Sequence, residues 1–380
     1  MSSEESVGLR AFMSKTKGIG GAIKKEPEDF IVEEITPDGT VLEVGKSHAF
    51  EDLPGDYIHF TLEKSNWDTM RAVNAVARAC SVSHKRLKFA GTKDRRSVSA
   101  QRVSIWKVPK EKLETVRIKD ITLRDFTMGS EPINLGTLSG NRFTVVIRDV
   151  DKGAEKTAKE TVKQLDNRMP NFFGTQRFGL RLNNHIVGKH ILRGEIKEAA
   201  MAFLCDTGNE PEEATKARSE LRKTEDFKTA FESFPNYLGF EKSVLNHLIK
   251  TPTDFVGGLR VLPKKLRKMF VHAYQGYIFN LALSEYIEKD EIPDELPLVG
   301  YTTSADKVTK AILKAEEIKV DEFKVPPMPE MTMKGESRKT IIQFKEFEIL
   351  DFNDKNRNLR VRFSLPPGSY ATMLLRELMK

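Results

Sequence analysis

Cysteine is scarce in this chain, and histidine does not occur in metal-binding patterns. The two cysteines, Cys80 and Cys205, are too few for a disulfide framework or, by themselves, for a zinc site. His185 and His190 are five residues apart, off the i,i+4 spacing of a helical zinc pair, so we expect no bound metal. Cys80 falls on the apolar face of a predicted helix, and we expect it to be a buried thiol.

Long apolar runs are missing as well. No run approaches the length that spans a membrane, and the first residues, MSSEESVGLR, lack the apolar core of a signal peptide. We therefore expect a cytoplasmic protein without a membrane segment. With 380 residues, 39% apolar and 31% charged, the chain is long enough for two globular domains.

Glycine-rich loops for nucleotides are not recognisable either. The segment Gly18–Gly21 lacks the spacing of a dinucleotide-binding loop, and no Walker lysine follows it. We expect no nucleotide cofactor, which argues against dinucleotide-dependent redox chemistry and against a methyltransferase with such a loop.

What the chain does have is concentrated positive charge. The net charge is +7, yet residues 85–119 hold 12 Lys and Arg against 3 Asp and Glu, a local balance of +9. The rest of the chain therefore sums to −2. Localised basicity indicates an anionic partner, and nucleic acid is the commonest candidate, although charge alone also fits a generic basic surface.

One stretch within this basic window contains the main candidate functional residue of the chain. It reads FAGTKDRRSVSAQ over residues 89–101 and has the pattern of a strand, a turn at Gly91-Thr92 and a second strand. The carboxylate of Asp94 is placed at the turn, among Lys93, Arg95 and Arg96. On charge pattern alone, Asp94 is more simply a turn-forming residue on a solvated loop than a nucleophile or general base kept ionised by cations.

The same stretch resembles the signature of the TruD family of tRNA pseudouridine synthases, GxKD followed by a basic residue, a small apolar one and Gln. The resemblance implies that Asp94 is the catalytic residue. It also implies that Lys93, Arg95 and Arg96 contact RNA.

Four further segments resemble the family in the same order along the chain. A lysine before the Pro-Glu-Asp-Phe run falls on Lys24, which the resemblance places in the active site as an ion-pair partner of Asp94; without it, Lys24 reads as an exposed lysine at a strand start. In the segment LGTLSGNRF, the resemblance places Asn141 and Phe143 in the active-site pocket. The simpler alternatives are a loop turn for Asn141 and core packing for Phe143. The other two segments are PNFFGTQRFG, with Gln176 and Arg177 as RNA contacts, and LPPGSYATMLLREL at the C-terminus.

The resemblance implies an α+β fold in two domains. A pseudouridine-synthase catalytic domain, residues 1–167 and 340–380, would contain a mixed, mostly antiparallel sheet with helices. A family-specific, mostly helical α/β TRUD domain, residues 168–339, would be inserted between its halves. The return of strand alternation near residue 340 independently fits an insertion.

The function implied is isomerisation of a uridine in the D-arm of tRNA, at position 13 in the family, to pseudouridine. The reaction exchanges one bond to uracil for another and needs no cofactor or metal. The expected partner is tRNA, with the enzyme as a monomer. The alternative from another class is a non-catalytic tRNA-binding protein or RNA chaperone, against which the intact Gly-Thr-Lys-Asp sequence argues.

Hydrophobic periodicity predicts the main elements outside these motifs. We expect a strand over residues 56–64, an amphipathic helix that ends at Cys80, and a closing helix that ends at Leu378. Residues 1 to about 18 are expected to be poorly ordered. Four further helices are predicted over residues 195–205, 214–231, 242–249 and 262–289.

Overall fold

The computed structural model of the protein describes residues 4–380 and contains two compact units. The sheet unit comprises Ser14–Met169 and Ile342–Lys380. The helical unit comprises Pro170–Ile341 together with the segment that ends at Met13. The sequence predicts domain boundaries after residues 167 and 339, each two residues before the boundary between the units in the structure. It also predicts that the first residues of the chain belong to the catalytic domain, whereas the segment that ends at Met13 belongs to the helical unit.

Residues 4–13 are ordered, contrary to expectation, because they pack on a long helix of their own unit; residues 1–3, on which the expectation also falls, lie outside the described residues. This helix, α10, spans Lys264–Lys289. Val7 and Leu9 are buried, and the side chain of Asn280 donates to the Val7 carbonyl at 3.0 Å. Side chains of α10 thus hold the backbone of this segment by hydrogen bonds, which sequence periodicity does not register.

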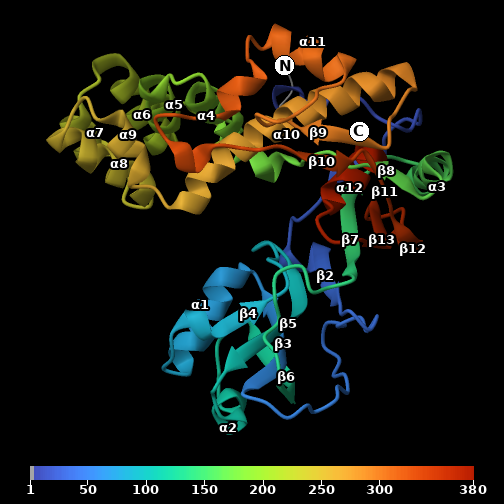
Figure 1. Ribbon diagram of the computed structural model, residues 1–380. Helices are drawn as coiled ribbons and strands as arrows, with labels where there is room; N and C mark the ends of the chain where they lie inside the picture. Colours follow the sequence, from blue (N-terminus) through green and yellow to red (C-terminus); the bar gives the residue numbers. More distant parts are fainter. Residues whose placement is uncertain (1–3) are drawn as a thin grey trace. The chain divides into compact units, whose positions relative to one another are not determined.

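The sheet unit is built on a mixed sheet with strand order β12-β13-β7-β2-β5-β3-β6 (Figure 1). Strand β1 pairs with β7 and β4 with β5, and every pairing in this sheet is antiparallel except that of β2 with β5. The expected α+β fold with a mixed, mostly antiparallel sheet is confirmed. The strands are β1 (Gly20–Ala22), β2 (Phe30–Ile35), β3 (Tyr57–Ser65), β4 (Leu87–Phe89), β5 (Val98–Trp106), β6 (Ile121–Gly129), β7 (Gly140–Val150), β12 (Lys345–Asn353) and β13 (Asn358–Leu365).

Helix α1 covers one part of this sheet and ends at Ala79, one residue before the predicted end at Cys80. Asp68 caps it by accepting a hydrogen bond from the Arg71 amide, and its apolar side chains, such as Val73 and Val76, pack on Phe60 and neighbouring strand residues. Cys80 is fully buried in this cluster. The helices of the sheet unit are α1 (Thr69–Ala79), α2 (Lys110–Glu114), α3 (Ala154–Leu165) and α12 (Ala371–Met379), with the short turns η2 (Pro27–Asp29) and η3 (His84–Arg86).

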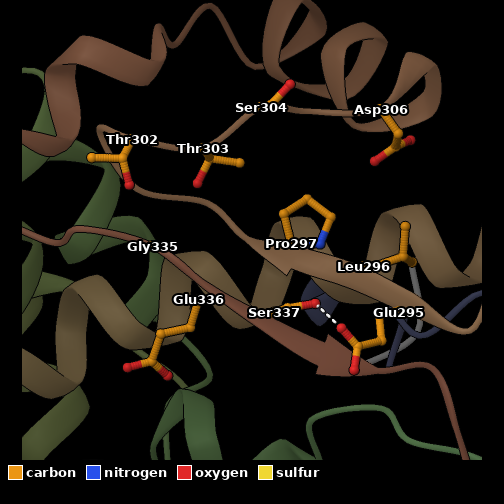
Figure 2. Close-up of a pocket in the computed structure, with 10 residues that line it drawn as sticks. All are labelled: Glu295, Leu296, Pro297, Thr302, Thr303, Ser304, Asp306, Gly335, Glu336 and Ser337. Carbon is orange, nitrogen blue, oxygen red and sulfur yellow. Dashed lines mark hydrogen bonds between the residues drawn. The ribbon is translucent and has the colours of Figure 1, made fainter.

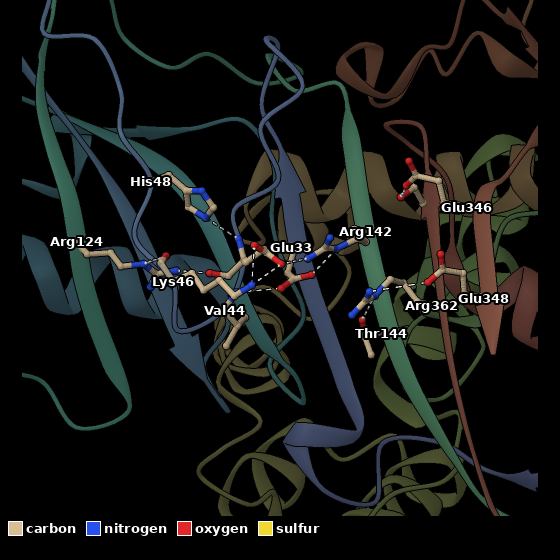
Figure 3. A network of polar contacts seen from close by, with 12 residues as sticks. Glu33, Val44, Lys46, His48, Arg124, Arg142, Thr144, Glu346, Glu348 and Arg362 are labelled. Atoms are coloured by element: carbon tan, nitrogen blue, oxygen red, sulfur yellow. Dashed lines mark hydrogen bonds and ion pairs between the residues drawn. The ribbon is translucent and has the colours of Figure 1, made fainter. Parts of the chain in front are cut away.

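The two faces of the sheet differ because neighbouring side chains along a strand alternate. Val32 and Glu34 point to the face that α1 covers, whereas Glu33 points to the other, where it bonds to Arg142 of β7 at 2.8 Å. Figure 3 shows the network on this second face, in which Arg362 of β13 and the carboxylates Glu346 and Glu348 of β12 also take part. These charges neutralise one another, so this face is a structural ion-pair layer.

In the helical unit some helices pack directly on α10 and the others pack on those helices, and a two-stranded antiparallel sheet is formed by β9 and β10. The single helix predicted over residues 214–231 is two helices, because Glu225 adopts a left-handed φ of 48° and Asp226 caps the second. The elements are η1 (Glu5–Val7), η4 (Thr175–Phe178), α4 (Asn184–Leu192), α5 (Ile196–Cys205), α6 (Glu212–Thr224), α7 (Phe227–Ser233), α8 (Gly239–Lys250), α9 (Phe255–Arg260), β9 (Glu295–Leu298), α11 (Lys307–Ala315), η5 (Val320–Phe323), η6 (Pro329–Met331) and β10 (Glu336–Lys339).

Two short strands, β8 (Arg168–Pro170) and β11 (Ile341–Gln343), contain the points at which the chain passes between the units. Among residues 4–380, no helix combines the length and apolar character needed to cross a bilayer.

Candidate active site

Asp94 lies in the sheet unit, in the loop of residues 90–97 between β4 and β5, here called the Asp94 loop. Its carboxylate accepts a hydrogen bond from the ammonium of Lys24 at 2.8 Å. The Lys24 side chain is 16% exposed and the Asp94 side chain 41% exposed, so the pair opens to solvent on the carboxylate side. The structure therefore brings together two residues that are 70 positions apart in the sequence.

The backbone at Lys24 helps to aim its side chain at Asp94. Lys24 adopts a left-handed φ of 59°, uncommon for a residue with a side chain, between β1 and η2. Its ammonium also lies 4.2 Å from the ring centre of Phe30, a cation–π contact. The alternative reading of Lys24, an exposed lysine at a strand start, does not hold, because its side chain is 16% exposed and β2 begins only at Phe30.

Two buried side chains beneath the Asp94 loop hold its backbone. Gln101 of β5 donates to the Gly91 carbonyl at 2.9 Å and accepts from the Thr69 hydroxyl at 2.8 Å. Thr69, the first residue of α1, in turn accepts from the Lys93 amide at 2.8 Å. The loop is thus tied to both a strand and a helix, which limits the positions that Asp94 can take.

Lys64 of β3 holds the loop at Asp94 itself. Its ammonium donates to the Trp67 carbonyl at 2.6 Å and to the Asp94 carbonyl at 3.1 Å, and the residue is 1% exposed. Burial, together with the nearby charge of Lys93, lowers the pKa of Lys64 to about 8. Lys64 therefore places a titratable positive charge directly beneath the candidate carboxylate.

Lys93 takes a structural position in this arrangement. Its ammonium bonds to the Glu34 carboxylate at 2.7 Å, and the two side chains are 5% and 1% exposed. A buried, paired lysine has no surface for an RNA phosphate. The geometry therefore does not support the expected RNA contact at Lys93 and favours a role in anchoring the loop.

Asn141 and Phe143 lie on the same face of the sheet as Glu34. Asn141 is opposite Glu34 in the pairing of β7 with β2, and its side-chain oxygen is buried without a hydrogen-bond partner among residues 4–380. Buried polar atoms without a partner are rare in folded proteins, so this oxygen is available for a ligand.

Phe143 is packed between two other rings. The Phe30 ring meets it edge-on at 6.0 Å and the Phe363 ring stacks on it at 5.5 Å, which leaves Phe143 8% exposed. Phe143 therefore supports Phe30, which in turn carries the Lys24 ammonium. In this structure Phe143 is part of the core and does not offer an exposed ring on which a base could stack.

The remaining predicted RNA contacts fall in two places. Arg95 and Arg96 are exposed on the Asp94 loop, and Arg96 donates to the Lys25 carbonyl at 2.8 Å. Gln176 and Arg177 belong to η4 of the helical unit. Gln176 is exposed, whereas the Arg177 guanidinium packs 5.0 Å from the Phe173 ring centre and has a buried Nε without a partner among residues 4–380.

A polar pocket of about 410 Å³ in the helical unit has a different character (Figure 2). Its carboxylates, Glu295, Asp306 and Glu336, would repel phosphates. Asp306 caps α11, and Glu295 bonds to Ser337, so two of them are already engaged. We therefore do not regard this pocket as the site. Among residues 4–380, no group of three or more His, Cys, Asp or Glu is arranged to hold a metal ion.

Sequence reasoning did not assign roles to Glu34, Lys64, Thr69 and Gln101, the residues that hold the loop. Glu34 and Lys64 did carry a signal, because each occupies an inward position in an alternating strand where apolar residues are usual. Charged residues at such positions are rarely buried unless they are paired.

Comparisons with known proteins match this chain over nearly its whole length. The family model described as tRNA pseudouridine synthase D (TruD) matches residues 6–296 and 287–378. A probable tRNA pseudouridine synthase D of Methanosarcina barkeri is 34% identical, over 99% of this chain and 97% of that protein. One of Methanococcus vannielii is 38% identical, over 98% of each chain.

A solved structure is similar over the same extent. The crystal structure of a tRNA pseudouridine synthase D (TruD) from Methanosarcina mazei matches with a TM-score of 0.81 and 31% identity, and covers 99% of this chain and 97% of that one. The matches in sequence and structure both extend over nearly the whole chain, so the chain belongs to the tRNA pseudouridine synthase D (TruD) family of isomerases.

Proposed function

We propose that this protein converts a uridine in the D-arm of tRNA, position 13 in the family, to pseudouridine, with Asp94 as the catalytic carboxylate. The observation that carries the proposal is the contact of Asp94 with Lys24 at 2.8 Å, at the two positions that the family resemblance assigns to the active site.

The chemistry requires little more than a placed carboxylate. The bond between ribose C1′ and uracil N1 breaks, the uracil turns, and C1′ bonds to C5. N1 gains a proton and C5 loses one, so substrate and product are isomers. An ionised carboxylate serves either as a nucleophile or as a base at the ribose. Lys24 favours the ionised form of Asp94 because opposite charges attract.

The unpartnered oxygen of Asn141 supports a place for the base beside the Asp94 loop. Its position opposite Glu34, the anchor of Lys93, puts it next in the row of polar side chains under the Asp94 loop. A carbonyl oxygen accepts hydrogen bonds, and uracil offers an imide N–H as donor. We propose that Asn141 accepts this hydrogen bond once the uridine has left the stack, as chemistry on a stacked base requires.

The substitution Asp94→Asn tests the proposal. We expect it to abolish pseudouridine formation, with the affinity for tRNA changed only a few-fold, because Asn keeps the size of Asp and removes its charge. The assay is release of tritium from tRNA labelled at uridine C5, since the mass of the product equals that of the substrate.

The matched control is Asp149→Asn. Asp149 pairs with Lys25, the neighbour of Lys24, on the exposed surface. Near-normal turnover by Asp94→Asn would exclude Asp94 as the catalytic residue. Tight tRNA binding by the wild-type protein without any pseudouridine formation would favour the alternative of a non-catalytic tRNA-binding protein or RNA chaperone.

A further inference from the structure

Leu135 is an apolar side chain that the fold leaves in solvent beside the Asp94 loop. It is 76% exposed, compared with 45% for Leu53 and 36% for Leu350 of the same unit. It lies in the loop between β6 and β7, whose next residue, Gly136, donates its amide to the Ala90 carbonyl at 2.8 Å. Ala90 is the first residue of the Asp94 loop, so Leu135 stands at the rim of the candidate site.

The backbone around Leu135 is a defined turn. The Thr137 amide bonds to the Asn134 carbonyl at 3.1 Å, and Gly136 has a φ of +87°, which is the geometry of a type II turn with Leu135 at its first corner. Hydrogen bonds hold the turn on both sides. The Ile133 amide donates to the Ser104 hydroxyl at 2.9 Å, and the Ser139 amide donates to the Ile35 carbonyl at 2.9 Å. The leucine is therefore presented from a fixed support.

Chemistry at a stacked uridine leaves a gap in the RNA. Extrusion of a base costs a few kcal/mol in lost stacking and pairing, and water in the gap does not restore the apolar contacts of the bases on either side. Apolar side chains that enter a base step offset this cost, and leucine is among those that nucleic-acid-binding proteins use.

We propose that Leu135 enters the base stack of the RNA and fills the space left by the flipped uridine. The proposal rests on the proposed function, because it needs a substrate uridine to leave a stem at the Asp94 loop. Arg95 and Arg96, exposed on that loop, supply cations for the flanking phosphates. The occupant of the Leu135 surface is thus a base step of the substrate RNA.

The test compares one tRNA transcript in two forms. In one form the target uridine is in its stem, and in the other the opposite strand of that stem is changed so that the uridine is unpaired. We expect Leu135→Ala to lower kcat/KM roughly tenfold on the stem form, since most of an apolar contact is lost, and much less on the unpaired form. Leu135→Met should retain most of the activity. The control is Leu53→Ala, near the end of β3 remote from the Asp94 loop.

A second readout does not require catalysis. In the Asp94→Asn background, a fluorescent adenine analogue next to the target uridine should brighten when the protein binds, and less so when Leu135 is also alanine. Equal losses on the two RNAs, or unchanged kcat/KM and unchanged fluorescence, would overturn the proposal. Failure of the proposed function would look different: the wild-type protein would form no pseudouridine in either RNA, whatever the fluorescence shows.

Discussion

Lys24 and Lys25 are adjacent in the sequence but bind different carboxylates. Lys24 reaches Asp94 and is 16% exposed, whereas Lys25 pairs with Asp149 and is 48% exposed. They share the same bulk attraction for RNA, so a comparison between them separates a role at the site from a role in general electrostatics.

We expect Lys24→Met to move the acid limb of the rate profile to higher pH. The ammonium favours the ionised form of Asp94, so without it the carboxylate becomes protonated, and inactive, at a higher pH. The measurement is kcat against pH at saturating tRNA. Lys25→Met is the control and should leave the limb in place. Equal losses for both variants, with no movement of the limb, would mean that Lys24 contributes only general charge.

Lys64 provides a stability test with a definite sign. Its pKa is lowered from 10.5 to about 8 by burial, so between these values the unfolded chain binds a proton that the folded chain does not. Stability from this group therefore rises with pH across that window and is lowest below about pH 8.

We expect the difference in unfolding free energy between wild type and Lys64→Met to grow by about 3 kcal/mol from about pH 7.5 to about pH 10.5. Urea denaturation at the two pH values measures it, and the substitution of an exposed lysine, Lys88→Met, serves as reference. A difference that stays constant with pH would show that folding does not lower the pKa of Lys64.

At the scale of elements, the Asp94 loop depends on its attachment to α1 and β5. Gln101 connects the two, through the Gly91 carbonyl and the Thr69 hydroxyl. Its replacement leaves buried polar groups without partners, each at a cost of about 1–3 kcal/mol. The lost bonds fix the loop and not the RNA, so the effect should appear mainly in turnover.

We therefore predict that Gln101→Leu lowers kcat at least about tenfold while the dissociation constant of tRNA stays within a few-fold. Single-turnover rates and equilibrium binding measure the two quantities separately. Gln164→Leu, on the exposed side of α3, should affect neither. A loss in affinity equal to the loss in rate would instead place Gln101 in the RNA-binding surface.

At the scale of the whole molecule, fewer cations of the basic window, residues 85–119, can contact RNA than their number in the sequence suggests. Two of its cations are internal: Lys93 pairs with Glu34, and Arg102 donates to the Asp125 carbonyl at 2.6 Å. Arg95 is exposed beside Asp94 and remains available for phosphate.

Binding of tRNA should weaken steeply with salt, and Arg95→Ala should reduce the slope of log affinity against log salt by about 0.7–0.9, the value for one phosphate contact. Lys46→Ala makes the same change in net charge on the sheet face that carries the ion-pair network (Figure 3), and should leave the slope unchanged. A flat titration for the wild-type protein would mean that the basic window faces solvent in the complex.

Local patterns in the sequence were sufficient to predict several secondary-structure elements of this protein. Alternation in β3 and β5 and the apolar stripe of α1 identify the elements, because period and burial are tied by strand and helix geometry. The turn at Gly91-Thr92 and the concentration of positive charge indicate Asp94 as a candidate functional residue. The family resemblance names its chemistry.

The family resemblance implies Lys24 as the partner of Asp94, but only the tertiary structure decided which other residues hold the Asp94 loop. The pairing of Asp94 with Lys24 and the burial of Lys93 on Glu34 join residues 70 and 59 positions apart. Contacts of this separation depend on how β2, β5 and β7 pair, and no local propensity contains that information. For the same reason the sequence determined that the Asp94 loop is basic, whereas only the fold determined which of its cations are exposed to RNA and which hold the loop.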